Sequence, residues 1–169
     1  MKKNYNIVAI VSARGGSKGV PNKNIKFLNG KPLILHSLKS LLKVREIDKI
    51  VLSSDSNKIL NIVKNFSKKI QLMKRPKYLA VDKTPLTSVV KHSAIELTRK
   101  GYIADYVLQI APTCPFIKTN TIKSIIKLLK KGNDCVVTLK KIEHEHPYRA
   151  KKLNEKNFQF KSFLKKINV

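Results

Sequence analysis

Short apolar runs rich in β-branched residues alternate along this chain with longer amphipathic segments. The apolar runs predict buried strands over five stretches, 7–11, 47–53, 70–73, 106–110 and 134–139. Between them, apolar side chains recur three and four residues apart, which predicts amphipathic helices. Strands and helices that alternate in this way predict an α/β fold in three layers, with a mainly parallel sheet and helices on both faces. The carboxyl ends of the strands are then the expected position of a binding site.

Residues with capping chemistry mark the expected starts of the helices. Pro32 suits the first position of one helix, because a proline there lacks only an N–H that has no helical partner in any case. Thr84 is expected to cap another helix, with Pro85 at its first position. Thr119 or Asn120 is expected to cap the last predicted helix.

The stretch that follows the first strand is rich in glycine and in positive charge. It reads ARGGSKGVPNKN over 13–24. Three glycines in five residues allow backbone N–H groups to point toward one place, and Arg14, Lys18 and Lys23 add three cations. At the carboxyl end of a strand this combination favours a polyphosphate site. The alternative is a glycine-rich turn with solvated lysines.

The loop lacks two widespread phosphate-binding motifs. A Walker loop needs Ser or Thr after the Lys of G-x-x-x-x-G-K, but here Lys18 precedes Gly19. No G-x-G-x-x-G is present, so a dinucleotide-binding site is not indicated. The loop therefore belongs to another class of phosphate site.

Four motifs stand in the order in which a known family has them. They read ARGGSKGVPNKNIKFLNGKPLI at 13–34, VLSSDSNKI at 51–59, KRPKYLAVDKT at 74–84 and LQIAPTCPFIKTNTI at 108–122. Nearly all of the chain thereby resembles the CMP-N-acetylneuraminate (acylneuraminate) cytidylyltransferases, which include the pseudaminate and legionaminate cytidylyltransferases. The resemblance implies a Rossmann-like fold of the nucleotide-diphospho-sugar transferase type. It also implies a CTP-binding nucleotidyltransferase domain over 1–150 and the start of a dimerising segment over 151–169.

The chemistry implied by the resemblance is nucleotidyl transfer. The anomeric hydroxyl of a nine-carbon keto-sugar acid attacks the α-phosphate of CTP, and the products are a CMP-sugar and pyrophosphate. Such a site needs fixed cations and backbone donors for the leaving group. Arg14 and Lys23 align with triphosphate-handling residues and are the expected catalytic residues. The expected nucleotide-binding residues are Ala13, Gly15, Gly16, Ser17, Lys18, Asn24, Arg75, Asp82 and Thr84.

Three of the implied contacts have alternatives. Arg75 stands in the family's R-P motif, where an arginine reaches the cytosine and can donate to its O2 and N3; the alternative is a surface arginine before a turn. Asp82 and Thr84 are expected to complete the base pocket, although Asp82 is equally suited to the start of a helix. Gln109 matches a glutamine that faces the sugar. This chain inserts Ile110-Ala111 after it and lacks the arginine that usually follows, so that alignment stays open.

The resemblance also sets expectations for the C-terminal part. Members of the family continue through a dimerising segment to an Asp-x-Asp that carries the catalytic Mg²⁺, whereas this chain ends at Val169 without that motif. We therefore expect Mg²⁺ as cofactor but no metal ligands of this kind within 1–169, and a homodimer whose dimerising segment is incomplete. We expect a truncated or fragmentary member that binds CTP but transfers the nucleotide poorly or not at all. The alternatives are a nucleotide-binding remnant without catalysis and a sugar nucleotidyltransferase that uses another nucleotide.

Composition changes this picture little. Lys and Arg number 36 against 10 Asp and Glu, a formal net charge of +26, which attracts an anionic nucleotide and an anionic sugar. A basic nucleic-acid-binding module is the remaining alternative. No specific nucleic acid is expected, since the lysines are spread through every predicted helix and only 7% of residues are aromatic. Cys114 and Cys135 fit no metal spacing, and no apolar run is long enough for a membrane span, so we expect a cytoplasmic protein.

Overall fold

The computed structural model describes residues 5–16, 19–139, 151–154 and 159–162 of the chain. Backbone contacts divide the chain into two units, 1–136 and 137–169. The second unit contains an antiparallel hairpin of β7 (Lys151–Asn154) and β8 (Gln159–Ser162). The first unit carries the other elements. The functional division expected at residue 150 stays a prediction.

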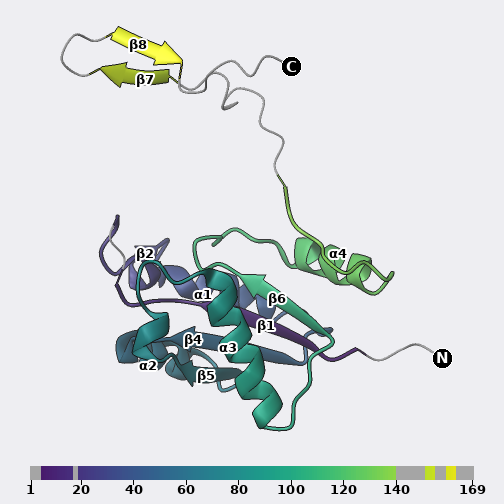
Figure 1. Cartoon of the computed structure of the whole chain (residues 1–169). Coiled ribbons are helices and arrows are strands. Elements are labelled where there is room, and N and C mark those ends of the chain that lie inside the picture. The colour runs from purple at the N-terminus through teal and green to yellow at the C-terminus, as the bar shows by residue number, and fades with distance from the viewer. Residues whose placement is uncertain (1–4, 17–18, 140–150, 155–158, 163–169) are drawn as a thin grey trace. The chain divides into compact units, whose positions relative to one another are not determined.

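A four-stranded parallel sheet forms the middle of the first unit (Figure 1). Its strands are β1 (Ile7–Ser12), β4 (Lys49–Ser54), β5 (Ile70–Lys74) and β6 (Tyr106–Ile110), in the order β5-β4-β1-β6 across the sheet. β1 pairs with β4 on one side and with β6 on the other. Residues 7–11 are 0% exposed. A parallel strand that is buried on both faces explains the unbroken apolar run.

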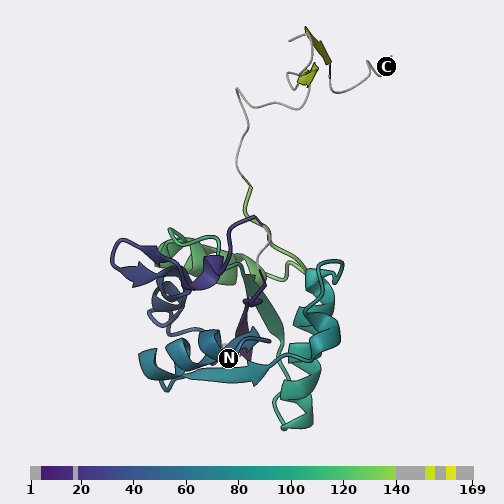
Figure 2. The ribbon, with the colours of Figure 1, turned by 90° about the vertical axis from the view of Figure 1, so that its left-hand side faces the viewer.

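Helices cover both faces of this sheet (Figure 2). α1 (Leu33–Leu41), α2 (Asn57–Phe66) and α4 (Thr119–Leu129) pack on one face, and α3 (Leu86–Arg99) packs on the other. Alternate side chains of β1 divide between the two cores, as the two-residue period of a strand requires. The predicted three-layer α/β architecture is confirmed.

A short hairpin leads the chain from the glycine-rich loop into α1. Its strands are β2 (Phe27–Leu28) and β3 (Lys31–Pro32). Asn29 and Gly30 form the turn, with φ of 46° and 72°. Two consecutive residues with positive φ are the geometry for which Asn-Gly is strongly preferred.

The helix starts differ from the predicted ones by one or two residues. Pro32 and Pro85 are the N-cap residues of α1 and α3 rather than their first helical residues, because their ψ angles of 135° and 138° are extended. Thr84 therefore does not cap α3. The cap predicted at Thr119 or Asn120 is also wrong, because α4 already begins at Thr119.

The strand predicted over 134–139 is wrong, because these residues form no strand. Among the described residues β6 pairs with β1, and its other edge has no partner strand. α4 lies on the same face of the sheet as α1 and α2. α1 connects β1 to β4 and α2 connects β4 to β5, so both cross the sheet in the direction away from β6. A parallel strand added to the open edge of β6 through a helix on this face would make a left-handed crossover, which proteins strongly disfavour. The apolar run alone does not contain this constraint.

Candidate functional site

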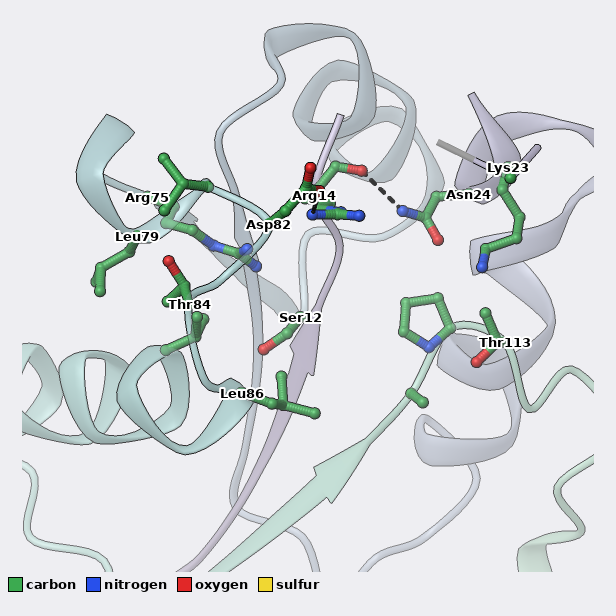
Figure 3. A pocket seen from close by; sticks show the side chains of 15 residues that line it. Ser12, Arg14, Lys23, Asn24, Arg75, Leu79, Asp82, Thr84, Leu86 and Thr113 are labelled. Carbon is green, nitrogen blue, oxygen red and sulfur yellow. Dashed lines mark hydrogen bonds and ion pairs between the residues drawn. The ribbon is translucent and has the colours of Figure 1, made fainter. Parts of the chain in front are cut away.

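A cavity of about 390 Å³ opens at the carboxyl ends of the parallel strands (Figure 3). This is the position that the sheet topology predicts for a ligand site. Its walls come from the segments that follow β1, β5 and β6 and from the start of α3. The lining residues are Ser12, Arg14, Gly19, Lys23, Asn24, Arg75, Leu79, Val81, Asp82, Thr84, Leu86, Val89, Ala111, Pro112 and Thr113.

Arg75 is the most deeply buried cation of this cavity, with 5% of its surface exposed. Its backbone N–H donates to the Ser54 carbonyl at 2.8 Å and so continues the pairing of β5 with β4. Its guanidinium donates from Nη2 to the Ser53 carbonyl at 2.8 Å and from Nε to the Ser53 hydroxyl at 3.3 Å. Arg75 is therefore not the surface residue that the alternative interpretation requires.

The side-chain hydrogen bonds of Arg75 go to a neutral residue. Burial lowers the pKa of the Arg75 guanidinium, the negative charge of Asp55 raises it, and the positive charge of Arg14 lowers it. Ser53, which accepts both hydrogen bonds of the Arg75 guanidinium, is neutral. A buried cation held by a neutral partner favours an electron-rich ligand group in the adjoining cavity.

Lys23 and Asn24 reach the cavity because of a local backbone conformation. Asn22 has a φ of 54°, in the left-handed region that Asn tolerates better than most residues. The chain then forms the single-turn helix η1 (Lys23–Ile25). Asn24 is 6% exposed, and its Nδ2 donates to the Arg14 carbonyl at 2.9 Å. Figure 3 shows Lys23 and Arg75 on opposite sides of the cavity, with Arg14 between them.

An ion pair between Arg14 and Asp82 joins two walls of the cavity. Arg14 follows β1, and Asp82 follows the short helix η2 (Lys77–Leu79) that comes after β5. Their side chains are 33% and 40% exposed. Part of the positive charge of the cavity is thus balanced within the chain.

Gly15 faces the start of α2 instead of the cavity. Its N–H donates to Oδ1 of Asp55 at 2.9 Å, and a Cβ at this position would lie 2.9 Å from the Cβ of Ser56. The glycine is required here for close packing, and its amide is already engaged. Ala13 is likewise buried, and its N–H donates to the Ser53 carbonyl at 3.0 Å. Gly16 is exposed and does not line the cavity.

The structure brings together six of the expected site residues at the cavity: Arg14, Lys23, Asn24, Arg75, Asp82 and Thr84. Ser17 and Lys18 lie outside the described residues. Gln109 is exposed and does not line the cavity. Thr113, further along the same segment, lines the cavity instead.

Sequence reasoning missed Ser12 and the apolar wall. The hydroxyl of Ser12 is buried without a hydrogen-bond partner among the described residues, and Ser12 lines the cavity. A polar residue at the last position of a buried strand is the signal that could have found it. Leu86, the first residue of α3, is 42% exposed and lines the cavity with Leu79 and Val89.

The described residues contain no cluster of metal-ligating side chains. Among them there is no group of three or more His, Cys, Asp or Glu side chains that could hold a metal ion. Asp82 is the carboxylate among the residues that line the cavity, and it is paired with Arg14. Magnesium therefore stays an expectation from the family resemblance. Within the part of the chain that the structure describes, no helix is both long and apolar enough to cross a membrane.

The family model described as Cytidylyltransferase matches residues 8–159. The chain belongs to the cytidylyltransferase family. The resemblance indicated by the four motifs is confirmed, and so is the nucleotidyltransferase fold that it implies.

Two curated relatives and one solved structure resemble this cytidylyltransferase chain over most of its length. The CMP-N,N'-diacetyllegionaminic acid synthase of Legionella pneumophila is 35% identical over 140 residues, which are 80% of this chain and 58% of the relative. The pseudaminic acid cytidylyltransferase of Campylobacter jejuni is 34% identical over 151 residues, 89% of this chain and 64% of the relative. The chain thus spans less than two thirds of the length of either relative.

The solved structure supports the fold. It is a CMP:2-keto-3-deoxy-manno-octonic acid synthetase complexed with CTP, with a TM-score of 0.61 at 21% sequence identity. The match covers 75% of this chain and 48% of that one.

Proposed function

We propose that this chain carries the CTP-binding part of a cytidylyltransferase that activates a nonulosonic, sialic-type sugar acid. CTP and the sugar acid would form a CMP-sugar and pyrophosphate. The observation that supports this most strongly is the convergence of Arg14, Lys23, Asn24 and Arg75 on one cavity at the carboxyl ends of the strands. The names of the relatives, which refer to legionaminic and pseudaminic acid, support the substrate class.

The two ends of the cavity suit the two parts of a nucleoside triphosphate. Leu79, Leu86 and Val89 provide apolar surface for a base near the buried guanidinium of Arg75. That guanidinium supplies N–H donors, which match the O2 and N3 acceptors of cytosine. Arg14 and Lys23 supply charge for the phosphates. A volume of about 390 Å³ lies within the ordinary range for a small-molecule site.

In the proposed reaction the chain acts mainly through position and charge. Negative charge develops on the phosphate oxygens as the bond to pyrophosphate breaks, and fixed cations stabilise it. Arg14 would exchange Asp82 for a phosphate oxygen when the nucleotide binds. Lys23 would contact the leaving pyrophosphate from the side of the cavity that is opposite Arg75 (Figure 3). The hydroxyl of Ser12 is placed to donate to the nucleotide near the end of β1.

The partners other than CTP and the sugar acid, and the location of the reaction, are further parts of the proposal. The homodimer and the Mg²⁺ requirement remain predictions from the family resemblance, and a specific nucleic-acid partner is not expected. We assign the reaction to the cytoplasm, where CTP is available. The exposed, unpaired Cys114 and Cys135 are compatible with that reducing compartment.

A comparison of nucleotides tests the proposal. Thermal unfolding of the purified chain is measured with CTP, UTP, GTP and ATP at equal concentrations. CTP should raise the melting temperature most, because binding to the native state stabilises it. Equal effects of UTP or GTP would favour a sugar nucleotidyltransferase of another specificity. Incubation with CTP and neuraminate, legionaminate or pseudaminate, followed by assay of pyrophosphate, then tests transfer and the choice of sugar.

A further inference from the structure

The carboxyl end of β4 binds two cavity segments that are far apart in the sequence. The Ser53 carbonyl accepts the Ala13 N–H at 3.0 Å and Nη2 of Arg75 at 2.8 Å. It therefore connects the residue before Arg14 with the buried guanidinium. Ser53 does not line the cavity itself, so it acts on the site only through these neighbours.

Asp55 extends this support to the glycine-rich loop. Its Oδ1 accepts the Gly15 N–H at 2.9 Å, directly after Arg14 in the chain. Its backbone carbonyl accepts Nζ of Lys74 at 2.6 Å. The hydroxyl of Ser54 accepts the N–H of Ser56 at 3.1 Å and fixes the turn between them. Asp55 does not line the cavity.

We propose that Asp55 is a positioning residue of the nucleotide site, which fixes the start of the phosphate loop through the Gly15 amide. The inference rests on the proposed function for the identity of the ligand. With Ala13 bound to Ser53 and Gly15 bound to Asp55, Arg14 is held by a backbone bond on either side. Its guanidinium can then meet a phosphate without first ordering the loop, and such preorganisation strengthens binding.

The direction in which CTP affinity changes when Asp55 is replaced distinguishes a positioning role from a purely electrostatic one. Asp55 is an anion behind a cationic cavity. If it acted through its charge alone, removal would strengthen the binding of an anionic nucleotide. If it positions the loop, removal weakens binding. Asp55→Ala removes the charge and the acceptor, whereas Asp55→Asn removes the charge and keeps an oxygen that can accept the Gly15 N–H.

Asp48 supplies a matched control at the opposite end of β1. Its Oδ2 accepts the Ile7 N–H at 2.5 Å, the same type of carboxylate-to-amide bond across a similar sequence distance. Asp48→Ala therefore carries a comparable loss of charge and of one backbone contact, away from the cavity.

Isothermal titration calorimetry of the full chain with CTP measures the effect. Asp55→Ala should weaken CTP binding about fivefold or more, the equivalent of one hydrogen bond. Asp55→Asn should weaken it less, and Asp48→Ala should leave it within about twofold. CTP affinity that is unchanged or higher in both Asp55 variants overturns the proposal. An equal loss in Asp48→Ala also overturns it, because the cause would then be general stability. If Asp55→Ala does not fold, unchanged or higher CTP affinity in Asp55→Asn overturns the proposal, because an amide oxygen is a weaker acceptor for the Gly15 N–H than a carboxylate.

Amide hydrogen exchange gives a readout that does not depend on CTP. The Gly15 amide should exchange more rapidly in Asp55→Ala than in the unsubstituted chain, and Asp48→Ala should leave it protected. Unchanged protection in Asp55→Ala contradicts the positioning role. Absence of CTP binding by the unsubstituted chain contradicts the proposed function, while the exchange of Gly15 still decides whether Asp55 fixes the loop.

Discussion

Replacement of Asp82 with Asn tests how Arg14 is held before a nucleotide binds. Arg14 and Asp82 form an ion pair across the mouth of the cavity. A phosphate that binds Arg14 has to compete with this carboxylate. Asp82→Asn removes the competing charge and keeps the size of the side chain. We therefore expect the variant to bind CTP and free pyrophosphate more tightly than the unsubstituted chain.

The size of this effect follows from the exposure of the pair. The side chains of Arg14 and Asp82 are 33% and 40% exposed, so water and salt screen their attraction. Exposed ion pairs of this kind contribute about 0.2–1 kcal/mol. The expected gain in affinity is therefore at most about fivefold. The loss of stability should lower Tm by no more than about 4 °C. Added salt should reduce the difference between the two proteins.

Calorimetric titration with CTP and with pyrophosphate, at low and at physiological salt, measures this gain. Glu96→Gln is the matched control, because it removes the same charge and an exposed ion pair with Arg99 on α3, away from the cavity. An equal gain in CTP affinity in Asp82→Asn and Glu96→Gln would mean that the gain comes from the change in net charge. Weaker CTP binding by Asp82→Asn would refute the reasoning. It would mean instead that Asp82 contacts the nucleotide, as the family resemblance implies.

Three further predictions have defined outcomes. Arg75→Lys should weaken CTP binding about tenfold, because an ammonium cannot present two coplanar N–H donors; unchanged calorimetric affinity would exclude Arg75 from base recognition. Gly15→Ala should lower the free energy of unfolding in urea by about 1–3 kcal/mol, whereas Gly16→Ala, with open space around it, should not; equal costs would contradict the close packing. Burial raises the pKa of Tyr102 to about 12, so the stability that its neutral form contributes is present below pH about 10 and is lost as the pH rises through about 12. Tyr102→Phe should flatten urea-measured stability in that window, and an unchanged slope would contradict this.

The layers of the fold were predictable because each signal was local. The run over 7–11 is apolar without interruption since β1 is buried on both faces, and the sequence displays this directly. The segment over 134–139 also carries β-branched residues, but Asp134 and Thr138 interrupt its apolar run, and a strand also needs an edge that it can reach with the favoured crossover hand. That requirement depends on the face to which α4 packs, which no local pattern reveals.

The site was predictable as far as its side chains stand in contiguous motifs. Arg14, Lys23 and Arg75 were expected from such motifs, and all three line the cavity. The partner of the Gly15 amide was not predictable, because Asp55 lies 40 residues away and reaches it through the pairing of β4 with β1. The face to which Gln109 points depends on the register of β6, which the motif does not fix.

The most direct test of the central claim is a titration of the isotope-labelled chain with CTP, followed by amide chemical shifts. The account predicts saturable shifts concentrated at the cavity, at Ser12, Arg14, Asn24, Arg75 and Thr84. It predicts no comparable shifts on the outer surface of α4. Shifts that do not saturate, or that cluster on α4 and leave the carboxyl ends of β1 and β5 unchanged, would contradict it.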